Sequence, residues 1–171
     1  MSQDIDQILE KYRGKCVIID TNLLLLYVVG SHDLERICSF KRTKKFGKDD
    51  FFLVKRFIKC FKTIRTTPSI LTEVSNYLNQ LPEDMQPEYY SALSYCINSL
   101  LEIYETSAIL SKRDYLNKYG LTDTSIISDA RKKFVVLTDD FPLSGYLNSA
   151  GVDAINFNHL RMVNWYSQGL T

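Results

Sequence analysis

Four acidic positions in this sequence lie far apart along the chain, each near the expected end of a strand or start of a helix. They are Asp20, Glu73, Asp123 and the pair Asp139 and Asp140. Oxygen ligands are what Mg²⁺ and Mn²⁺ prefer, and a few carboxylates with water and a substrate phosphate are enough to hold such an ion. An ion held in this way lowers the pKa of a water molecule and neutralises charge on a leaving oxygen. The pattern therefore predicts a metal site that hydrolyses phosphodiester bonds.

A simpler role is open to each acid taken alone. Asp20, Asp123 and Asp140 each precede an expected helix, and Asp is among the preferred N-cap residues. Glu73 falls inside its expected helix, where its simplest role is that of a solvated surface carboxylate. Ser, Thr or Asn would cap a helix equally well, so capping does not explain why all of these positions are acidic. The set as a whole favours the metal site.

Strands and helices alternate in the predicted order of elements. Short apolar runs rich in β-branched residues predict buried parallel strands at 15–20 and 134–138, with a short strand at 64–66 and a last strand at 152–157. Helices are expected at 5–12, 23–29, 51–61, from Thr67-Pro68 across Glu73, and at 87–104, 107–119, 121–130 and 140–150, with Gly30, Gly120 and Gly151 as stops. This order predicts an α/β fold with three α/β/α layers and a central parallel sheet of four or five strands.

The predicted strands direct two of the acidic positions to one edge of the sheet. Asp20 ends the first strand, and Asp139 and Asp140 follow a later one. Ligands of open parallel sheets bind beyond the carboxyl ends of the strands. That edge is where we expect the metal site.

Four stretches of the sequence resemble, in order, the four blocks of a PIN domain. They are VIIDTNLLLL (17–26), TPSILTEV (67–74), YGLTDTSII (119–127) and VVLTDDFPL (135–143). PIN domains are Mg²⁺- or Mn²⁺-dependent nucleases, commonly ribonucleases, and many bacterial members are toxins of toxin–antitoxin pairs. The resemblance implies a single PIN-like nuclease domain over residues 1–171, with a basic helical insertion at about 31–63 that the compact toxins lack.

The resemblance also implies a role for each acid. Asp20 would be the first-strand ligand, Glu73 the helix acid and Asp123 the third acid. Asp140 would be the fourth, because the last block of the family usually places its acid two residues after a threonine, here Thr138. Asp139 is then an outer or alternative ligand.

Polar side chains next to these acids could orient them by hydrogen bonding to the carboxylates or to a bound phosphate. They are Thr21, Asn22, Thr124, Ser125 and Thr138. Helix capping and backbone contacts explain these residues about as well. Neither histidine falls inside one of the four blocks, so we expect a metal-activated water, and no imidazole base, to supply the nucleophile.

Basic residues are concentrated in one segment, although the net charge of the chain is only +1. Residues 41–65 contain ten Lys or Arg against two acids, so the remainder is net acidic. Such a segment suits a phosphate backbone, but a solvated helix face or a contact for an acidic protein partner is also compatible with it. Phe40, Phe46 and Phe52 could stack on bases or belong to the core. The best candidates for nucleic-acid contact are Lys41, Arg42, Lys44, Lys45, Lys55 and Lys59.

Composition and cysteine spacing narrow the remaining possibilities. A chain of 171 residues, 45% hydrophobic and 24% charged, fits one globular domain. The four cysteines lack the usual zinc spacings and are expected to be buried thiols in a reducing compartment. Without a signal-peptide pattern or an uninterrupted apolar span, we expect a cytoplasmic protein with no membrane partner. The expected partners are RNA or single-stranded DNA, an antitoxin or other protein, and a second copy of the chain.

Two other function classes fit this sequence less well than a nuclease does. One is a catalytically inactive PIN-like module that binds RNA or a protein, which would not need to keep every acid. The other is a phosphatase of the haloacid dehalogenase pattern, which needs a second Asp two residues after the first. Asn22 occupies that position after Asp20. The sequence therefore favours a metal-dependent endoribonuclease that leaves 5′-phosphate and 3′-hydroxyl ends.

Overall fold

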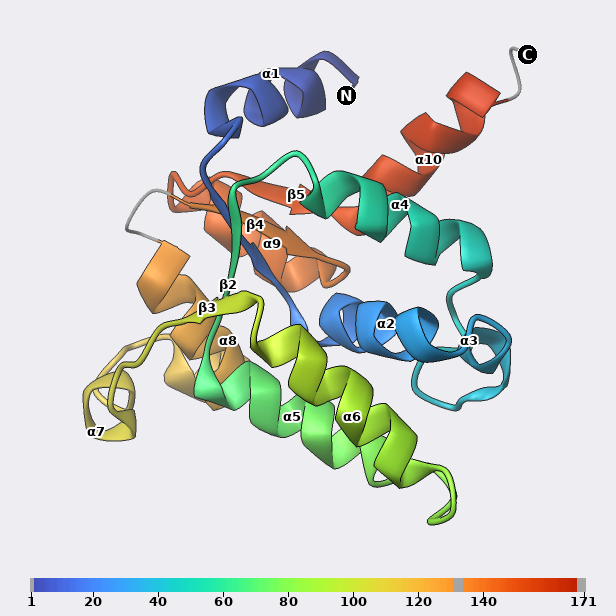
Figure 1. Ribbon diagram of the computed structural model, residues 1–171. Helices are drawn as coiled ribbons and strands as arrows, with labels where there is room; N and C mark the ends of the chain where they lie inside the picture. The colour runs from blue at the N-terminus through green and yellow to red at the C-terminus, as the bar shows by residue number, and fades with distance from the viewer. Residues whose placement is uncertain (1, 131–133, 169–171) are drawn as a thin grey trace.

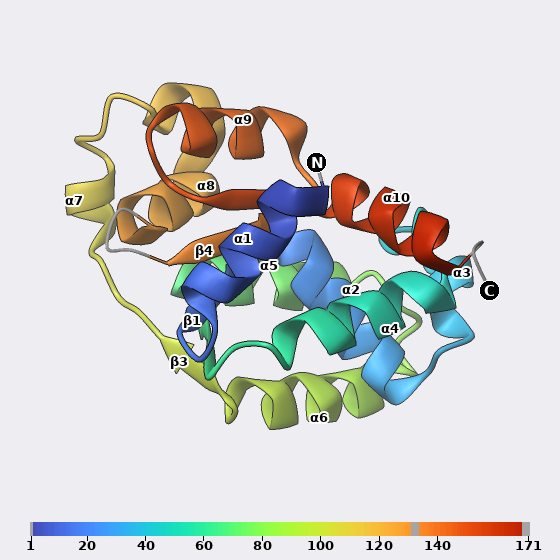
Figure 2. The same cartoon turned by 90° about the horizontal axis from the view of Figure 1, so that it is seen from above.

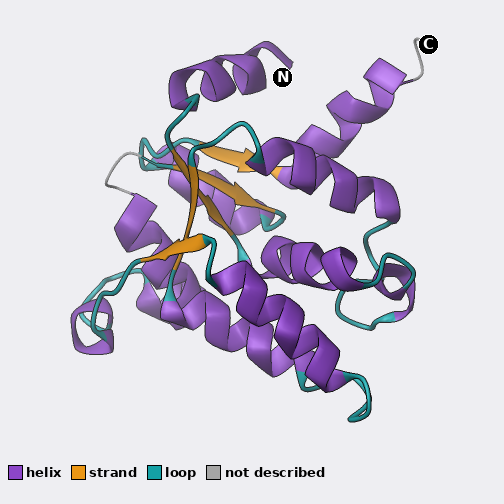
Figure 3. Cartoon of the chain, viewed as in Figure 1, coloured by secondary structure: helices purple, strands orange, loops and turns teal. Residues whose placement is uncertain are grey.

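The sheet is built from five parallel strands, in a computed structural model that describes residues 2–130 and 134–168. Its neighbours follow the order β3-β2-β1-β4-β5, and every pair is parallel. The prediction of a parallel sheet of four or five strands is confirmed, and the strands can be followed in Figures 1 and 3. The strands are β1 (Cys16–Ile19), β2 (Thr63–Thr66), β3 (Leu100–Glu102), β4 (Val135–Thr138) and β5 (Ala154–Asn156).

Helices cover both faces of this sheet. Figure 2 shows α8 and α9 on one side and α2, α4 and α6 on the other, which gives the predicted three layers. The helices in the described part of the chain are α1 (Ser2–Tyr12), α2 (Thr21–His32), α3 (Arg36–Ser39), α4 (Lys48–Ile58), α5 (Pro68–Leu78), α6 (Gln86–Ile97), α7 (Ser107–Leu110), α8 (Leu116–Ala130), α9 (Phe141–Ser149) and α10 (Phe157–Gln168).

The chain reverses its direction across the sheet between β1 and β4. From β1 it moves outward through β2 to β3, then returns to place β4 on the other side of β1 and continues to β5. Such a switch point opens a crevice at the carboxyl ends of the two central strands. Ile19 is paired with Leu137, and the backbone N–H of Asp20 donates to the Leu137 carbonyl at 3.0 Å. The chain segments after β1 and β4 therefore emerge side by side.

The core explains the long apolar run that follows β1. Leu23, Leu24, Leu25 and Leu26 are all buried, because α2 packs against helices on several sides. A helix that is apolar around its circumference is one buried on most sides. Helix α2 also runs through Gly30 to His32, so the predicted stop at Gly30 is wrong. A Cβ at Gly30 would lie 2.4 Å from Cδ2 of Phe51, and this glycine is what allows α4 to approach.

The predicted helix over 87–104 is wrong in its second half. Helix α6 ends at Ile97, and Leu100–Glu102 forms the edge strand β3, in which Leu101 is paired with Arg65. Tyr104 then follows in a loop and is 75% exposed. Leu100 and Tyr104 fit the helical spacing, but pairing with β2 determines the backbone there.

Two further helices differ from expectation. The helix predicted over 107–119 is instead the short α7 and the start of α8. Gly120, with φ of 73° and ψ of −178°, separates two helical segments within α8, which confirms its predicted role as a stop. Helix α10 was not predicted. Among the described helices, none is long and apolar enough to cross a membrane.

Some predictions about burial also need correction. Cys38 and Cys60 are exposed and Cys16 is half-buried, so only Cys96 is the buried thiol that was expected. Burial raises the pKa of Cys96 to about 11. Phe40 and Phe46 are buried in the core and are not available to stack on bases, whereas Phe52 is 50% exposed.

Candidate metal centre

Asp20 lies at the carboxyl end of β1 and is nearly buried, with 7% of its surface exposed. Its carboxylate caps α2 by accepting the backbone N–H of Asn22 at 3.1 Å. The hydroxyl of Thr138, the last residue of β4, donates to the other oxygen. The capping role considered for this residue is therefore real, and the same side chain also lies at the switch point.

Asp139 and Asp140 follow β4 and have different environments. Asp140 caps α9, since its Oδ1 accepts the backbone N–H of Leu143 at 2.7 Å, and the residue is exposed. The side chain of Asp139 is only 7% exposed. Its Oδ1 accepts an N–H of the Asn22 amide at 2.9 Å, which links the chain after β4 to the start of α2.

Glu73 projects from α5 and is held by two hydroxyls. Thr21, on α2, donates to Oε2 at 2.9 Å, and Thr122, on α8, donates to Oε1 at 2.9 Å. The glutamate is half-buried between three helices. It is thus not the freely solvated surface carboxylate that was its simplest interpretation.

Asp123, on α8 after the Gly120 kink, differs from the other acids in having no stabilising partner. Within the described residues its carboxylate has neither a hydrogen bond nor an ion pair, so it does not act as a helix cap. Burial, with the negative charges of Asp20, Asp140 and Glu73, raises its pKa from 3.8 to about 7. A carboxyl group with this pKa marks a place where negative charge is poorly compensated.

The electrostatics of Asp20 agree with those of Asp123. Burial, with the negative charges of Asp139 and Asp140, raises the pKa of Asp20 to about 6, against the hydrogen bonds from Thr138 and Asn22 that lower it. Each of the five acidic side chains therefore takes part in mutual repulsion with at least one other. The structure brings the predicted acids together from β1, α5, α8 and the end of β4.

The donor atoms of the acidic cluster suit a divalent ion. We define this cluster as Asp20, Glu73, Asp123, Asp139 and Asp140. The donors are all carboxylate oxygens, only Asp139 has an ion-pair partner among the described residues, and Asp123 has two oxygens without a hydrogen-bond partner, which suits a hard cation. In the part of the chain that the structure describes, no three Asp, Glu, His or Cys side chains already stand in a metal-binding arrangement. Binding would require the side chains to close around the ion.

The hydrogen bonds among the neighbouring polar residues are uneven. Thr21 and Thr138 each donate to one of the acids, and Asn22 donates to two, Asp20 and Asp139. The buried hydroxyl of Thr124 has no hydrogen-bond partner in the described structure, and Ser125 contacts Thr67 and the backbone instead of an acid. Thr122 was missed, although its place beside Asp123 in the third block was a signal that could have drawn attention to it.

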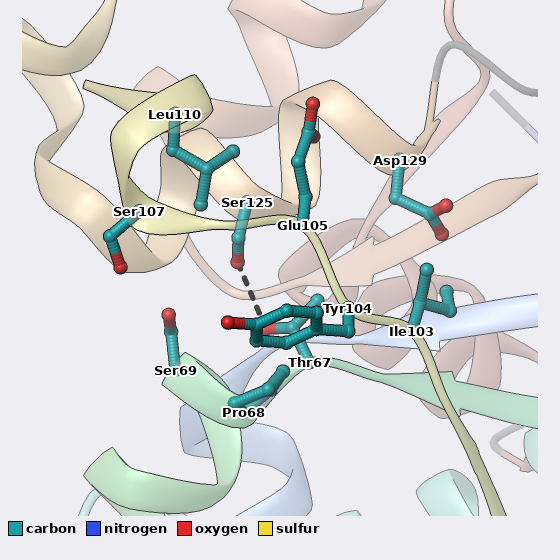
Figure 4. Close-up of a pocket in the computed structure, with 10 residues that line it drawn as sticks. All are labelled: Thr67, Pro68, Ser69, Ile103, Tyr104, Glu105, Ser107, Leu110, Ser125 and Asp129. Carbon is teal, nitrogen blue, oxygen red and sulfur yellow. Dashed lines mark hydrogen bonds between the residues drawn. The ribbon is translucent and has the colours of Figure 1, made fainter.

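A pocket lined by Thr67 and Ser125 contains a hydrogen bond that joins α5 to α8. Figure 4 shows Thr67, at the start of α5, facing Ser125 of α8, and their hydroxyls hydrogen-bond at 2.9 Å. None of the five acids lines this pocket. Ser125 also donates to the carbonyl of Thr122 at 2.6 Å. These bonds fix α5, which carries Glu73, against α8, which carries Asp123.

The six basic candidates are distributed over the loop before α4 and over α4 itself. Lys45 reaches the acidic cluster, where its ammonium pairs with Oδ2 of Asp139. Arg42 donates to Gln80 at 2.8 Å and lies over the ring of Tyr77 at 4.4 Å, and Lys55 lies 5.5 Å from the ring centre of Phe51. Lys41, Lys44 and Lys59 are exposed. The structure therefore brings one of the six into contact with the predicted acids.

A scan of the chain against models of known protein families gives no match, and a search of curated protein sequences gives none either.

Proposed function

We propose that this chain is a PIN-like, Mg²⁺- or Mn²⁺-dependent endoribonuclease. The observation that carries the proposal is the acidic cluster at the switch point, above all Asp123, whose carboxyl group is poorly compensated and has a pKa of about 7. Structural acids are normally paired or hydrogen-bonded, whereas perturbed groups gather at functional sites. A divalent cation would supply the missing positive charge.

In this proposal the acids have different roles in holding the ion, which follow from their different contacts. Asp20 and Asp123 provide the buried negative charge, and Glu73 is oriented by two threonine hydroxyls, as a group that positions ligands should be. Asp140 is fixed at the start of α9 with Oδ2 free of the capping bond. When bound, a divalent ion would lower the pKa of a water and neutralise charge on the leaving oxygen.

RNA as the substrate class is supported by the charge distribution. The basic segment at 41–65 enters the fold next to the acids, since Lys45 contacts Asp139. Lys41, Lys44 and Lys59 are exposed and have no ion pair among the described residues, so they are available for phosphates. Contacts of this kind contribute affinity without sequence preference.

The decisive experiment compares wild type with Asp20→Asn and Asp123→Asn on a labelled mixture of RNAs with Mn²⁺. We expect wild type to cleave internally and leave 5′-phosphate and 3′-hydroxyl ends, and both variants to lose at least about 100-fold in rate, because removing a metal ligand or its support costs this order of activity. The matched control is Asp84→Asn, which changes an exposed acid outside the cluster. If wild type cleaves no RNA with Mn²⁺ and none with Mg²⁺, the proposal is wrong.

A second candidate function is an inactive PIN-like module that binds RNA or a protein. It is favoured by the ion pair between Lys45 and Asp139, in which the protein itself already supplies a cation to the cluster. Calorimetric titration with Mn²⁺ separates the two functions. Binding that Asp123→Asn abolishes supports the nuclease, and RNA binding by a wild type that takes up no Mn²⁺ supports the module.

A further inference from the structure

Lys45 brings a positive charge to the acidic cluster from outside the four sequence blocks. It belongs to the turn between α3 and α4, and its ammonium pairs with Asp139. The two side chains differ in exposure, since 7% of the Asp139 side chain and 51% of the Lys45 side chain are accessible. Within the described residues, Lys45 is the one cationic side chain in ion-pair contact with the cluster.

The turn that carries Lys45 is anchored without the help of this ion pair. Thr43 is fully buried, and its hydroxyl donates to the carbonyl of Ile37 at 2.9 Å. Phe46, 3% exposed, packs edge-on against Phe157 with ring centres 6.1 Å apart. Helix α4 is held in turn by an ion pair of 2.7 Å between Asp50 and Arg161. The backbone at Lys45 is therefore fixed beside the cluster, while its side chain is free to change partner.

Only the lysine end of this ion pair is solvent-accessible, so the lysine is the partner that can exchange. Its ammonium is a compact charge on a flexible stem that suits a phosphate as well as a carboxylate, and a divalent ion could take over the compensation of the buried Asp139. A divalent ion and an ammonium that draw on the same cluster charge compete with each other, and such competition is reciprocal. A lysine that loses Asp139 to an ion remains beside the acids.

We propose that Lys45 is an exchangeable cation of this site: it neutralises Asp139 in the ion-free protein, yields to the divalent ion, and then binds a phosphate of the RNA. The inference rests on the proposed function and deepens it. It makes Lys45 a positioning residue for substrate and a competitor of the metal. A single substitution of Lys45 should therefore strengthen Mn²⁺ binding and weaken RNA binding.

The test uses the full chain with Lys45→Gln, and with Lys45→Ala as a second variant. Without RNA, we expect calorimetry to show Mn²⁺ binding about two- to fivefold tighter than in wild type, because the competing charge is gone. With RNA and saturating Mn²⁺, we expect KM to rise about three- to tenfold while kcat changes less. The matched control is Lys44→Gln, an exposed neighbour, for which Mn²⁺ affinity should stay as in wild type.

The outcomes separate this inference from the proposed function. If Lys45 only stabilises the fold, both variants should be less stable than wild type and should bind Mn²⁺ equally well or more weakly. If wild type binds Mn²⁺ and cleaves RNA while both Lys45 variants show unchanged or weaker Mn²⁺ affinity, the exchange role is wrong and the nuclease stands. If wild type binds no Mn²⁺, both proposals fall.

Discussion

Thr122 donates its hydroxyl to Oε1 of Glu73 at 2.9 Å, although the two residues are 49 positions apart. Thr21 occupies the other oxygen of the same carboxylate from α2. Glu73 is consequently held between two helices that do not belong to its own segment of chain. Its orientation depends on correct packing of α2, α5 and α8.

Replacing Thr122 by Val removes one of these donors while keeping the side-chain shape. We expect a loss of about 1 kcal/mol in the free energy of unfolding, typical of a hydrogen bond to a partly buried group. We also expect about a 10- to 100-fold loss of Mn²⁺ affinity or cleavage rate, as for other residues that orient ligands. Chemical denaturation and Mn²⁺ titration measure the two effects. Thr122→Ser keeps the hydroxyl and should retain most of the stability and most of the Mn²⁺ affinity. If Thr122→Ser loses as much as Thr122→Val, the hydrogen bond to Glu73 is not the cause.

The pKa of Asp123 predicts how stability depends on pH in the metal-free protein. The pKa is about 7 in the folded state against 3.8 as the ordinary value. Between these values the folded state binds more protons than the unfolded state, so stability falls as pH rises from about 4 to 7 and this contribution then levels off. Asp123→Asn should remove it and, at pH 8, stabilise the protein by about 1 kcal/mol, equivalent to ~2–4 °C in Tm.

Melting curves in chelator at pH 5, 6, 7 and 8 measure this dependence. Asp84→Asn, which alters an exposed acid, should keep the slope of wild type. Equal slopes for wild type and Asp123→Asn would show that Asp123 is not the source.

Addition of Mn²⁺ should reverse the penalty of the clustered charge. At a free concentration 100 times Kd, a ligand that binds only the folded state stabilises it by about 2.7 kcal/mol. The gain should shrink as pH is lowered from 7 to 5, because Asp20 and Asp123, with pKa values of about 6 and about 7, must lose protons before they bind. Melting with and without Mn²⁺ at each pH tests this, and a gain that persists in Asp20→Asn would place the ion elsewhere.

Two helical glycines should respond oppositely to alanine. Gly30→Ala introduces a Cβ 2.4 Å from Phe51 and should destabilise by about 1–3 kcal/mol through overpacking. Gly145→Ala, in α9, meets nothing within 4 Å and should stabilise by about 0.5–1 kcal/mol. Denaturant midpoints give both values. Stabilisation by Gly30→Ala would contradict the close packing of α2 on α4.

The exposed lysines of the basic segment predict a salt dependence of RNA binding. Each phosphate contact to a single strand contributes about 0.7 to the slope of log affinity against log salt concentration. Lys41→Gln combined with Lys44→Gln should lower the magnitude of the slope by about 1.4 if both contact phosphates. Anisotropy titrations from low to high salt measure it. Lys112→Gln, an exposed lysine outside the segment, is the control and should leave the slope unchanged.

The sequence predicted those parts of the fold whose local pattern and tertiary role agree. Strands β1 and β4 are buried on both faces and read as unbroken apolar runs, and Thr67 and Asp140 cap the helices expected to follow them. Strand β3 could not be found in this way. It is a three-residue edge strand whose spacing continues the pattern of α6, and only its pairing with β2 defines it.

The sequence could indicate which acids belong to the candidate site. It could not indicate which other side chains contact them. Residue type and position after a strand identify Asp20 and Asp139. The hydrogen bond from Thr122 to Glu73 and the ion pair from Lys45 to Asp139 join residues 49 and 94 positions apart, and no local pattern encodes them. Gly30 shows the same limit, because its close contact with Phe51 exists only after α4 has packed.

The pairing of β1 with β4 has a consequence for the time at which this protein can first act. Val17 lies beside Val135, so more than one hundred intervening residues must be synthesised before the two central strands can meet. A ribosome making this chain therefore carries an incomplete acidic cluster until Asp139 and Asp140 have been synthesised, well over one hundred residues after Asp20. Late closure of the sheet would keep the proposed nuclease inactive until both halves of the acidic cluster are present.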